Sequence, residues 1–257
     1  MGSSMNIPFI DDPFQKQKKN LHIKTGSIVL MSGRGFASDI VKVGTQSCWS
    51  HVGVILNSPN FSSRLKKEEE DEDPNNLYML HAYPEPLAYD LFYKSYTKTG
   101  VQLHRLTDVI KNYKGNVFIR LLRENAFMCG TRDNHDPFSF SSESSPFEIW
   151  LFENTMHKSY EKDYLSLPKA QIDIPKSSSW WPFCGPLFQN KEDISSYFCS
   201  ELVRKTLYQL FPIECAYVQG EISAEWTPAN FAPYSSEQKE PRMDTSKLWE
   251  DYLIQLK

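Results

Sequence analysis

The sequence has few cysteines, and no two of them are close together. Only 5 occur in 257 residues, at positions 48, 129, 184, 199 and 215. Because this number is odd, the spacing is wide and no Cys-x-x-Cys pair is present, the pattern argues against a disulfide framework and a thiolate zinc site. We therefore expect free thiols in a reducing compartment, and we expect no metal or organic cofactor.

Long apolar runs and a surplus of positive charge are also missing. The first twenty residues lack the apolar core of a signal peptide, and no apolar run is long enough to span a bilayer. Gly2 invites a myristoylation interpretation, but Asn6 stands where that motif requires Ser or Thr. We therefore expect a cytoplasmic protein. The formal net charge of -4 disfavours nucleic acid as a partner, since phosphate binding needs a basic surface.

The composition that remains is that of a globular protein rich in aromatic residues. Hydrophobic residues make up 40% of the chain and aromatic residues 14%, which supplies ample side-chain area for one large core. We expect a polar lead-in at 1–24 and a single domain at 25–257, with inserts at about 57–76 and 177–193. The charged first insert predicts a solvated hairpin extension, with an acidic docking loop as the alternative.

Short β-prone runs follow one another closely and predict a largely antiparallel sheet of five or six strands. The runs cover 27–31, 50–56, 77–82, 101–103 and 117–122. In the second run, the alternation of side chains places His51 and Gly53 on one face and Val52 and Val54 on the other.

Helical spacing of apolar residues occurs in four longer segments, which are 36–43, 147–160, 199–211 and the tail from Thr245. In the first segment, Phe36, Ile40 and Val43 lie on one side. The segment 199–211 is the strongest prediction, with Ser195 or Ser196 as its cap and Pro212 at its end.

Two further stripes are weaker. Ile149, Phe152 and Met156 approximate one in the segment 147–160, and Leu248, Tyr252 and Leu253 form another in the tail. Thr227 is also expected to cap a short helix that has Pro228 at its first position.

Cys199 lies in the first turn of the strongest predicted helix. Unpaired backbone N–H groups and the positive end of the helix dipole favour a thiolate there. The N–H of Cys199 itself would stabilise a developing oxyanion. The alternative is that Cys199 is a small, buried apolar residue, which is common for a free cysteine.

His51 opens the second predicted strand, and Gly53 leaves space on its face. A neutral imidazole is the usual base for a thiol. His81, on the next strand, could orient His51 by a hydrogen bond and complete a nucleophile–base–orienter triad. Glu85, beyond the end of that strand, is the alternative orienter. The alternative for both histidines is a structural role, at a strand edge or at the surface.

Taken together, these motifs resemble a known family. Ser-His-Val-Gly at 50–53 and Tyr-Phe-Cys-Ser-Glu-Leu-Val at 197–203 are similar to the circularly permuted NlpC/P60 (papain-like) group. That group includes bacterial YiiX-like proteins and a poxvirus branch, and it is related to the lecithin retinol acyltransferase fold. Smaller similarities lie at 25–30, 160–164 and Thr227-Pro228, so the resemblance spans about 25 to 231.

The resemblance implies an α+β fold of the permuted papain-like type, in which an antiparallel sheet packs on the helix that carries the cysteine. It implies Cys199 as the nucleophile, His51 as the base and His81 as the orienting residue. Permutation of the chain explains why the histidine precedes the cysteine. YiiX-like proteins often have Glu where His81 stands, and this departure together with the two inserts puts the transfer of a substrate in doubt.

The implied function is a cysteine-dependent hydrolase that cleaves an amide or ester bond through an acyl-thioenzyme. The alternatives are a lipid acyltransferase or thioesterase on the same site, and a non-catalytic binding module that keeps the fold. Candidate substrate-binding residues are Tyr197, Ser200, Trp180 and Trp181. The apolar segment 180–188 predicts either a lip that contacts acyl chains or a membrane surface, or a cover over the core.

Overall fold

The computed structural model describes residues 23–45, 47–57, 77–97, 99–123, 126, 146–160, 196–211, 226–233 and 248–257. Most of the predicted lead-in, nearly all of the first insert and the whole second insert lie outside these residues. Trp180, Trp181 and the segment 180–188 therefore lie outside the described structure as well.

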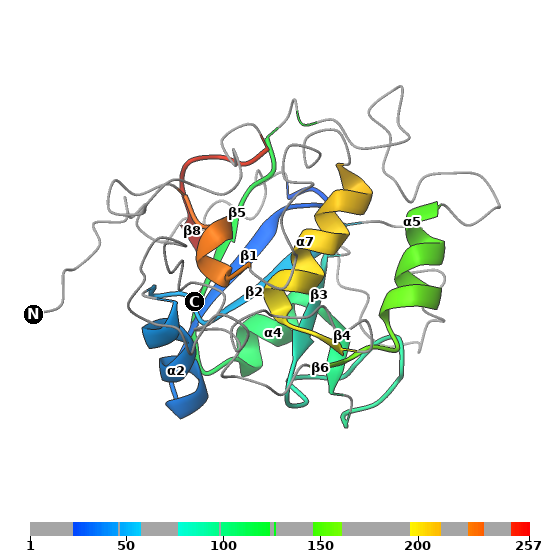
Figure 1. Cartoon of the computed structure of the whole chain (residues 1–257), viewed down its shortest axis with the longest axis horizontal. Coiled ribbons are helices and arrows are strands. Elements are labelled where there is room, and N and C mark those ends of the chain that lie inside the picture. The colour runs from blue at the N-terminus through cyan, green and yellow to red at the C-terminus, as the bar shows by residue number, and fades with distance from the viewer. Residues whose placement is uncertain are drawn as a thin grey trace, which may run out of the picture.

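A six-stranded antiparallel sheet in the order β4-β3-β2-β1-β5-β8 forms the centre of an α+β fold (Figure 1). The strands are β1 (Ile28–Gly33), β2 (His51–Asn57), β3 (Leu77–Tyr83), β4 (Gly100–Arg105), β5 (Gly115–Arg120) and β8 (Ile254–Gln255). The predicted antiparallel sheet is confirmed. Helices cover both faces of the sheet, so its central strands are nearly continuous runs of buried apolar and β-branched residues.

The two faces of the sheet are covered by different helices. Strand β1 pairs with β2 so that Leu30 lies opposite Val52 and Met31 lies opposite His51. Leu30 and Val52 belong to the apolar cluster under helix α7 (Cys199–Leu210), whereas Met31 belongs to the cluster under helix α4 (Leu106–Asn112). The alternation predicted for β2 is therefore confirmed, and it separates an α7 side from an α4 side.

Helix α7 crosses β2 and β3 (Figure 1). Its buried stripe matches the prediction and consists of Leu202, Val203, Leu207 and Leu210, with Phe211 just beyond the helix. The predicted cap at Ser196 is wrong, because Ser196 belongs to β7 (Ser196–Tyr197), which pairs with β6 (Ser159–Tyr160). Phe198 takes the N-cap position without a side-chain hydrogen bond, and its carbonyl accepts from the N–H of Leu202.

The predicted helix at 147–160 is shorter than expected and irregular. It consists of α5 (Pro146–Ile149) and the π-helix η1 (Trp150–Thr155). The wider turn of a π-helix moves the buried stripe, so Leu151 and Thr155 are buried while Ile149 is 43% exposed. No helix among the residues described here is both long and apolar enough to cross a membrane.

The predicted C-terminal helix is wrong in the part that the structure describes. Strand β8 lies there instead and pairs with β5, so that Ile254 lies opposite Ile119. Pairing with the open edge of the sheet gives hydrogen-bond partners to backbone N–H and C=O groups. The ends of a short helix would leave such groups without partners. In contrast, the short 3₁₀-helix η5 (Pro228–Phe231) is confirmed, with Thr227 and Asn230 forming its capping box.

Helix α2 (Phe36–Gly44) exposes the side chains that its spacing would turn toward a core. Phe36 is 83% exposed and Val43 is 78% exposed, and Ile40 is half-buried. Val41 is the buried residue of this helix. Among the described elements, the helix contacts mainly β1, and Val41 packs into the core while Phe36 and Val43 face solvent.

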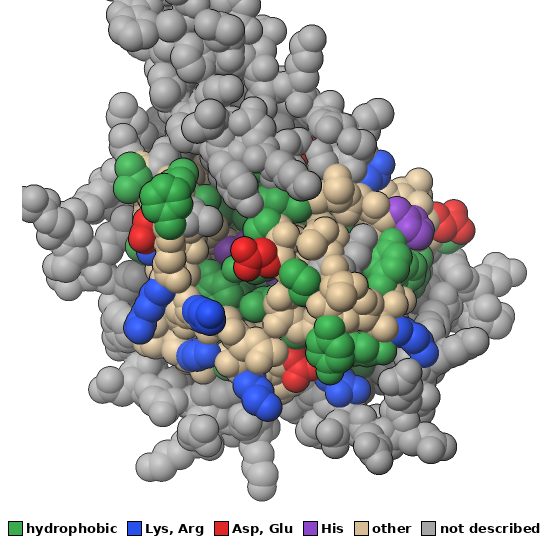
Figure 2. All heavy atoms as spheres, turned by 90° about the horizontal axis from the view of Figure 1, so that it is seen from below, with side chains coloured by type: hydrophobic (Ala, Val, Ile, Leu, Met, Phe, Trp, Pro, Cys, Tyr) green, Lys and Arg blue, Asp and Glu red, His purple; other side chains and the backbone are tan. Residues whose placement is uncertain are grey.

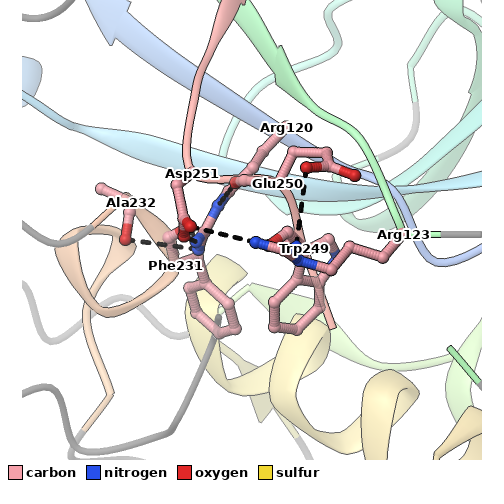
Figure 3. A network of polar contacts seen from close by, with 7 residues as sticks. All are labelled: Arg120, Arg123, Phe231, Ala232, Trp249, Glu250 and Asp251. Carbon is pink, nitrogen blue, oxygen red and sulfur yellow. Dashed lines mark hydrogen bonds and ion pairs between the residues drawn. The ribbon is translucent and has the colours of Figure 1, made fainter. Parts of the chain in front are cut away.

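Arg120 holds the end of β5 against the C-terminal segment (Figure 3). Its side chain is fully buried and donates from Nε to the carbonyl of Glu250 at 2.8 Å. From Nη1 it donates to the carbonyls of Phe231 and Ala232, at 3.1 and 3.3 Å. The guanidinium also stacks against Trp249, at 5.8 Å from the ring centre. One planar cation therefore joins β5, η5 and the tail.

We expect Arg120→Lys to lower the free energy of unfolding by about 2 kcal/mol, because an ammonium cannot reproduce the fork of donors or the stacking. Urea unfolding of the full chain measures this. Arg123→Lys is the matched control, since the side chain of Arg123 is 30% exposed, and we expect a change below about 1 kcal/mol. Equal losses in the two variants would contradict the role given to Arg120.

Candidate active site

Cys199 is the first residue of α7, and its side chain is buried. The backbone N–H groups of Val52, Ser200 and Cys199 itself lie near the sulfur and lower the pKa of the thiol. Two of these groups belong to the first turn of the helix, where N–H groups have no partner within the helix. The third comes from β2. These three N–H groups therefore act against the effect of burial on the thiol.

The predicted hydrogen bond between His51 and His81 is present. Nε2 of His51 lies 2.8 Å from Nδ1 of His81. The chain of rings continues to a third histidine, because Nε2 of His81 lies 3.2 Å from Nδ1 of His104 on β4. Register explains the row: His81 lies opposite Gln102, and Met79 lies opposite His104, so all three rings emerge on the α4 side.

Burial determines the charge state of these groups. It raises the pKa of the Cys199 thiol to about 11, although the three N–H groups act in the other direction. It lowers the pKa of His51 to about 3 and that of His104 to about 4. Burial also lowers the pKa of His81, and charge repulsion from His104 and His51 lowers it further. At neutral pH the site therefore holds a protonated thiol and three neutral imidazoles.

Cys199 and His51 approach the start of β2 from different sides. The sulfur contacts the N–H of Val52, the peptide group that joins Val52 to His51. However, the His51 side chain leaves the strand on the α4 side, and Cys199 packs on the α7 side. Among the residues described, no hydrogen bond joins the Cys199 sulfur to the His51 ring. The sulfur therefore lies by Val52, the residue next to His51, and forms no hydrogen bond with the His51 ring in the described structure.

Strands β2 and β3 separate at this point. Their ladder runs from Val54 to Asn57 on β2, so Val52 lies outside it. The N–H of Val52 can thus face the sulfur instead of a strand neighbour. The surface view of this end of the molecule has a hollow bordered by hydrophobic side chains, with a histidine visible inside it (Figure 2).

Tyr113 links the two sides at the end of the sheet. Its hydroxyl lies 3.4 Å from Oγ of Ser50, the residue before His51. Burial raises the pKa of Tyr113, and the charge of Cys199 contributes to this rise. Tyr113, which packs on the α4 side, is therefore within electrostatic range of the thiol.

The remaining predicted site residues have different outcomes. Ser200 is wrong as a substrate-binding side chain, because it is fully buried and its Oγ donates to the carbonyl of Trp226 at 2.6 Å. Glu85 is exposed and makes no hydrogen bond to His51 within the described structure, whereas His81 does. Tyr197 lies in β7. Cys48 is partly buried at the edge of the α7 cluster, in agreement with a structural role.

Sequence reasoning missed His104 and Tyr113. The signal for His104 was the predicted strand at 101–103, which continues to Arg105 and carries the histidine on the His81 face. No local signal marks Tyr113, because it follows α4 and reaches the site only through packing.

The described part of the chain contains no group of three or more His, Cys, Asp or Glu side chains placed to hold a metal ion. The side chains of His51, His81 and His104 form a row in which a ring nitrogen of each histidine is hydrogen-bonded to a ring nitrogen of the next. Compared with models of known protein families, the chain matches none, and no curated protein matches its sequence.

Proposed function

We propose that this chain is a cysteine-dependent hydrolase that cleaves an amide or ester bond through a thioester on Cys199. The observation that carries the proposal is the position of Cys199 in the first turn of α7, next to the start of β2, where His51 and His81 form a hydrogen bond. The backbone N–H groups of Val52, Ser200 and Cys199 also lower the pKa of the thiol. Such donors stabilise a thiolate and also a developing oxyanion. The helix that begins at Cys199 and packs on an antiparallel sheet supports the permuted papain-like fold and the NlpC/P60 family as parts of the proposal.

The reaction begins when Nδ1 of His51 takes the proton of the Cys199 thiol. The sulfur attacks the carbonyl carbon, a C–S bond forms, and the carbonyl π electrons move to the oxygen, which accepts from the N–H of Cys199. The C–N or C–O bond then breaks, and the leaving group takes the proton from His51. Water then gives a proton to His51 and attacks the thioester carbonyl. As the carbonyl forms again, the C–S bond breaks, the sulfur takes the proton from His51, and the acid is released.

His81 acts as a positioning residue in this scheme. When Nε2 of His51 carries a proton and donates it to Nδ1 of His81, Nδ1 of His51 keeps its lone pair and can act as a base. His104 supports the same tautomer by accepting from Nε2 of His81. Before this proton transfer, the His51 ring has to turn toward the sulfur, because the two side chains lie on different sides of the sheet. Contacts in a catalytic pair often tighten only in the substrate complex.

The experiment that tests the proposal is the capture of an acyl group. The full chain is mixed with p-nitrophenyl acetate near neutral pH, and the modified residue is located by mass spectrometry. We expect acetyl on Cys199 in the wild type and in Cys48→Ser, and none in Cys199→Ser. Acetyl on Cys48 at an equal rate, or no acetyl on Cys199, would refute the proposal.

A second candidate is acyl transfer to an acceptor other than water, for example with a fatty-acyl donor. The observation in its favour is the burial of the thiol, which is 5% exposed within an apolar cluster that includes Phe198 and Leu202. A thioester at this position is shielded from water. An adduct from a fatty-acyl thioester that persists until an alcohol or amine is added supports transfer, whereas steady release in water supports hydrolysis.

A further inference from the structure

The apolar side of α2 projects into solvent at the end of the sheet where β2 begins. Phe36 and Val43 are 83% and 78% exposed, and the half-buried Ile40 lies between them on the same side of the helix. Helix α2 follows directly from β1, whose residue Met31 pairs with His51. The exposed stripe is therefore close to the candidate active site.

Five basic residues surround the same end of the sheet, and we call them the basic rim: Arg34, Lys42, Lys111, Lys114 and Lys257. Backbone contacts place them together. The N–H of Arg34 donates to the carbonyl of Lys114 at 2.9 Å. Nζ of Lys257 donates to the carbonyl of Lys111 at 3.2 Å. Nζ of Lys42 donates to the carbonyl of Gly33 at 2.8 Å.

Acidic residues also lie at this end of the described structure. Asp39 on α2 forms an ion pair with Lys42 at 3.0 Å, and the exposed Glu85 follows β3 at the end that lies beside the start of β2. Among the described residues named here, the five basic ones outnumber these two acidic ones, although the whole chain has a formal net charge of -4. Lys and Arg side chains gather beside the hollow, exposed hydrophobic side chains lie along the same edge, and an acidic side chain lies at the hollow itself (Figure 2). The basic rim is therefore a local feature of this face.

An anionic bilayer fits this face better than a protein surface does. A stable protein interface buries about 800 Å² on each partner around a closely packed apolar centre. Three side chains that project from a nine-residue helix provide a much narrower contact. A bilayer requires no complementary pocket, because projecting apolar side chains enter the lipid boundary and cations bind the headgroups.

We propose that α2 and the basic rim dock the protein on anionic lipid membranes, with Phe36 and Val43 inserted at the boundary of the acyl chains. Docking in this orientation turns the hollow at the start of β2 toward the membrane. The proposal is independent of the chemistry of Cys199, because it depends only on exposed residues outside the thiol–imidazole site.

The test is co-sedimentation of the full chain with vesicles of phosphatidylcholine, with or without about 30% phosphatidylserine. We expect binding at least tenfold stronger to the anionic vesicles, and weaker binding as the salt concentration rises. We expect Phe36→Ser with Val43→Ser to reduce binding by about tenfold or more, because the apolar insertion is lost. Arg34→Glu with Lys114→Glu should reduce it by a similar factor.

Matched controls lie elsewhere on the surface. Tyr96→Ser removes an aromatic side chain that is 71% exposed, and Lys24→Glu reverses a charge just before the opposite end of β1. Both are expected to bind like the wild type, and circular dichroism verifies the fold of every variant. Equal binding to both vesicle types would overturn the proposal. Unchanged vesicle binding by the variant with Phe36→Ser and Val43→Ser would also overturn it. If that variant changes only in its oligomeric state, the apolar stripe contacts a protein partner instead.

Discussion

Replacing His51 with alanine is expected to slow the alkylation of Cys199 by iodoacetamide at pH 7 by about a thousandfold. The thiol has a pKa of about 11 because it is buried, so almost none of it ionises at pH 7 without a base. His51 has a pKa of about 3 and is neutral at that pH. It therefore has a lone pair to accept the proton. Peptide mass spectrometry measures the rate for each cysteine separately.

The same experiment separates the roles of the other histidines. We expect His81→Ala to slow alkylation about five- to tenfold, the value of one neutral hydrogen bond, because His51 remains but is no longer oriented. His157→Ala is the control, since His157 is exposed and bonded to Tyr93. Cys48 should react at one rate in every variant. Unchanged alkylation of Cys199 in His51→Ala would eliminate His51 as the base.

Acid is expected to destabilise the protein by about 4 kcal/mol or more between pH 7 and pH 5. In the unfolded chain each histidine has a pKa near 6.5, so all of them bind protons at pH 5. In the folded protein His51 and His104 stay neutral down to about pH 3 and pH 4. The unfolded state therefore binds more protons, and stability falls as the pH drops below about 6.5. Each of these two residues contributes about 2 kcal/mol at pH 5.

His81 acts in the same direction, since its pKa is also lowered. A loss of this size is a large share of the stability of a typical domain, which is about 5–15 kcal/mol. Urea unfolding at pH 7 and pH 5 measures it. In His104→Asn the amide oxygen takes the place of Nδ1 and the titrating group is gone. We expect the loss to shrink by about 2 kcal/mol in this variant, whereas His157→Gln should leave it unchanged. A pH-independent stability would show that the buried histidines do not titrate as described.

Local patterns were sufficient for the sheet, for α7 and for the pairing of His51 with His81. Alternation along β2 shows which side chains share a face, and helical spacing shows the buried stripe of α7. Strands joined by a hairpin are usually neighbours, so His81 was expected next to His51, and the hydrogen bond at 2.8 Å agrees. Each of these inferences uses residues that are close in sequence or on consecutive strands.

Patterns failed where the partner of a segment is distant in the chain. The tail has helical spacing, but it forms β8 because the open edge of β5 is available to it. Helix α2 has an apolar stripe, but the packed core takes Val41 while Phe36 and Val43 stay exposed. Ser200 follows Cys199 in sequence, but its hydroxyl is bonded to the carbonyl of Trp226.

The sequence by itself determined the central strands, α7, the faces of β2 and the positions of Cys199 at a helix start and His51 at a strand start. Only the tertiary structure decided that backbone N–H groups from β2 and α7 lower the pKa of the thiol, that His104 extends the row of histidines and that Tyr113 lies within electrostatic range of the thiol. The physical reason is that periodicity specifies which residues share a side of an element. What covers that side depends on packing between segments that are far apart in the chain.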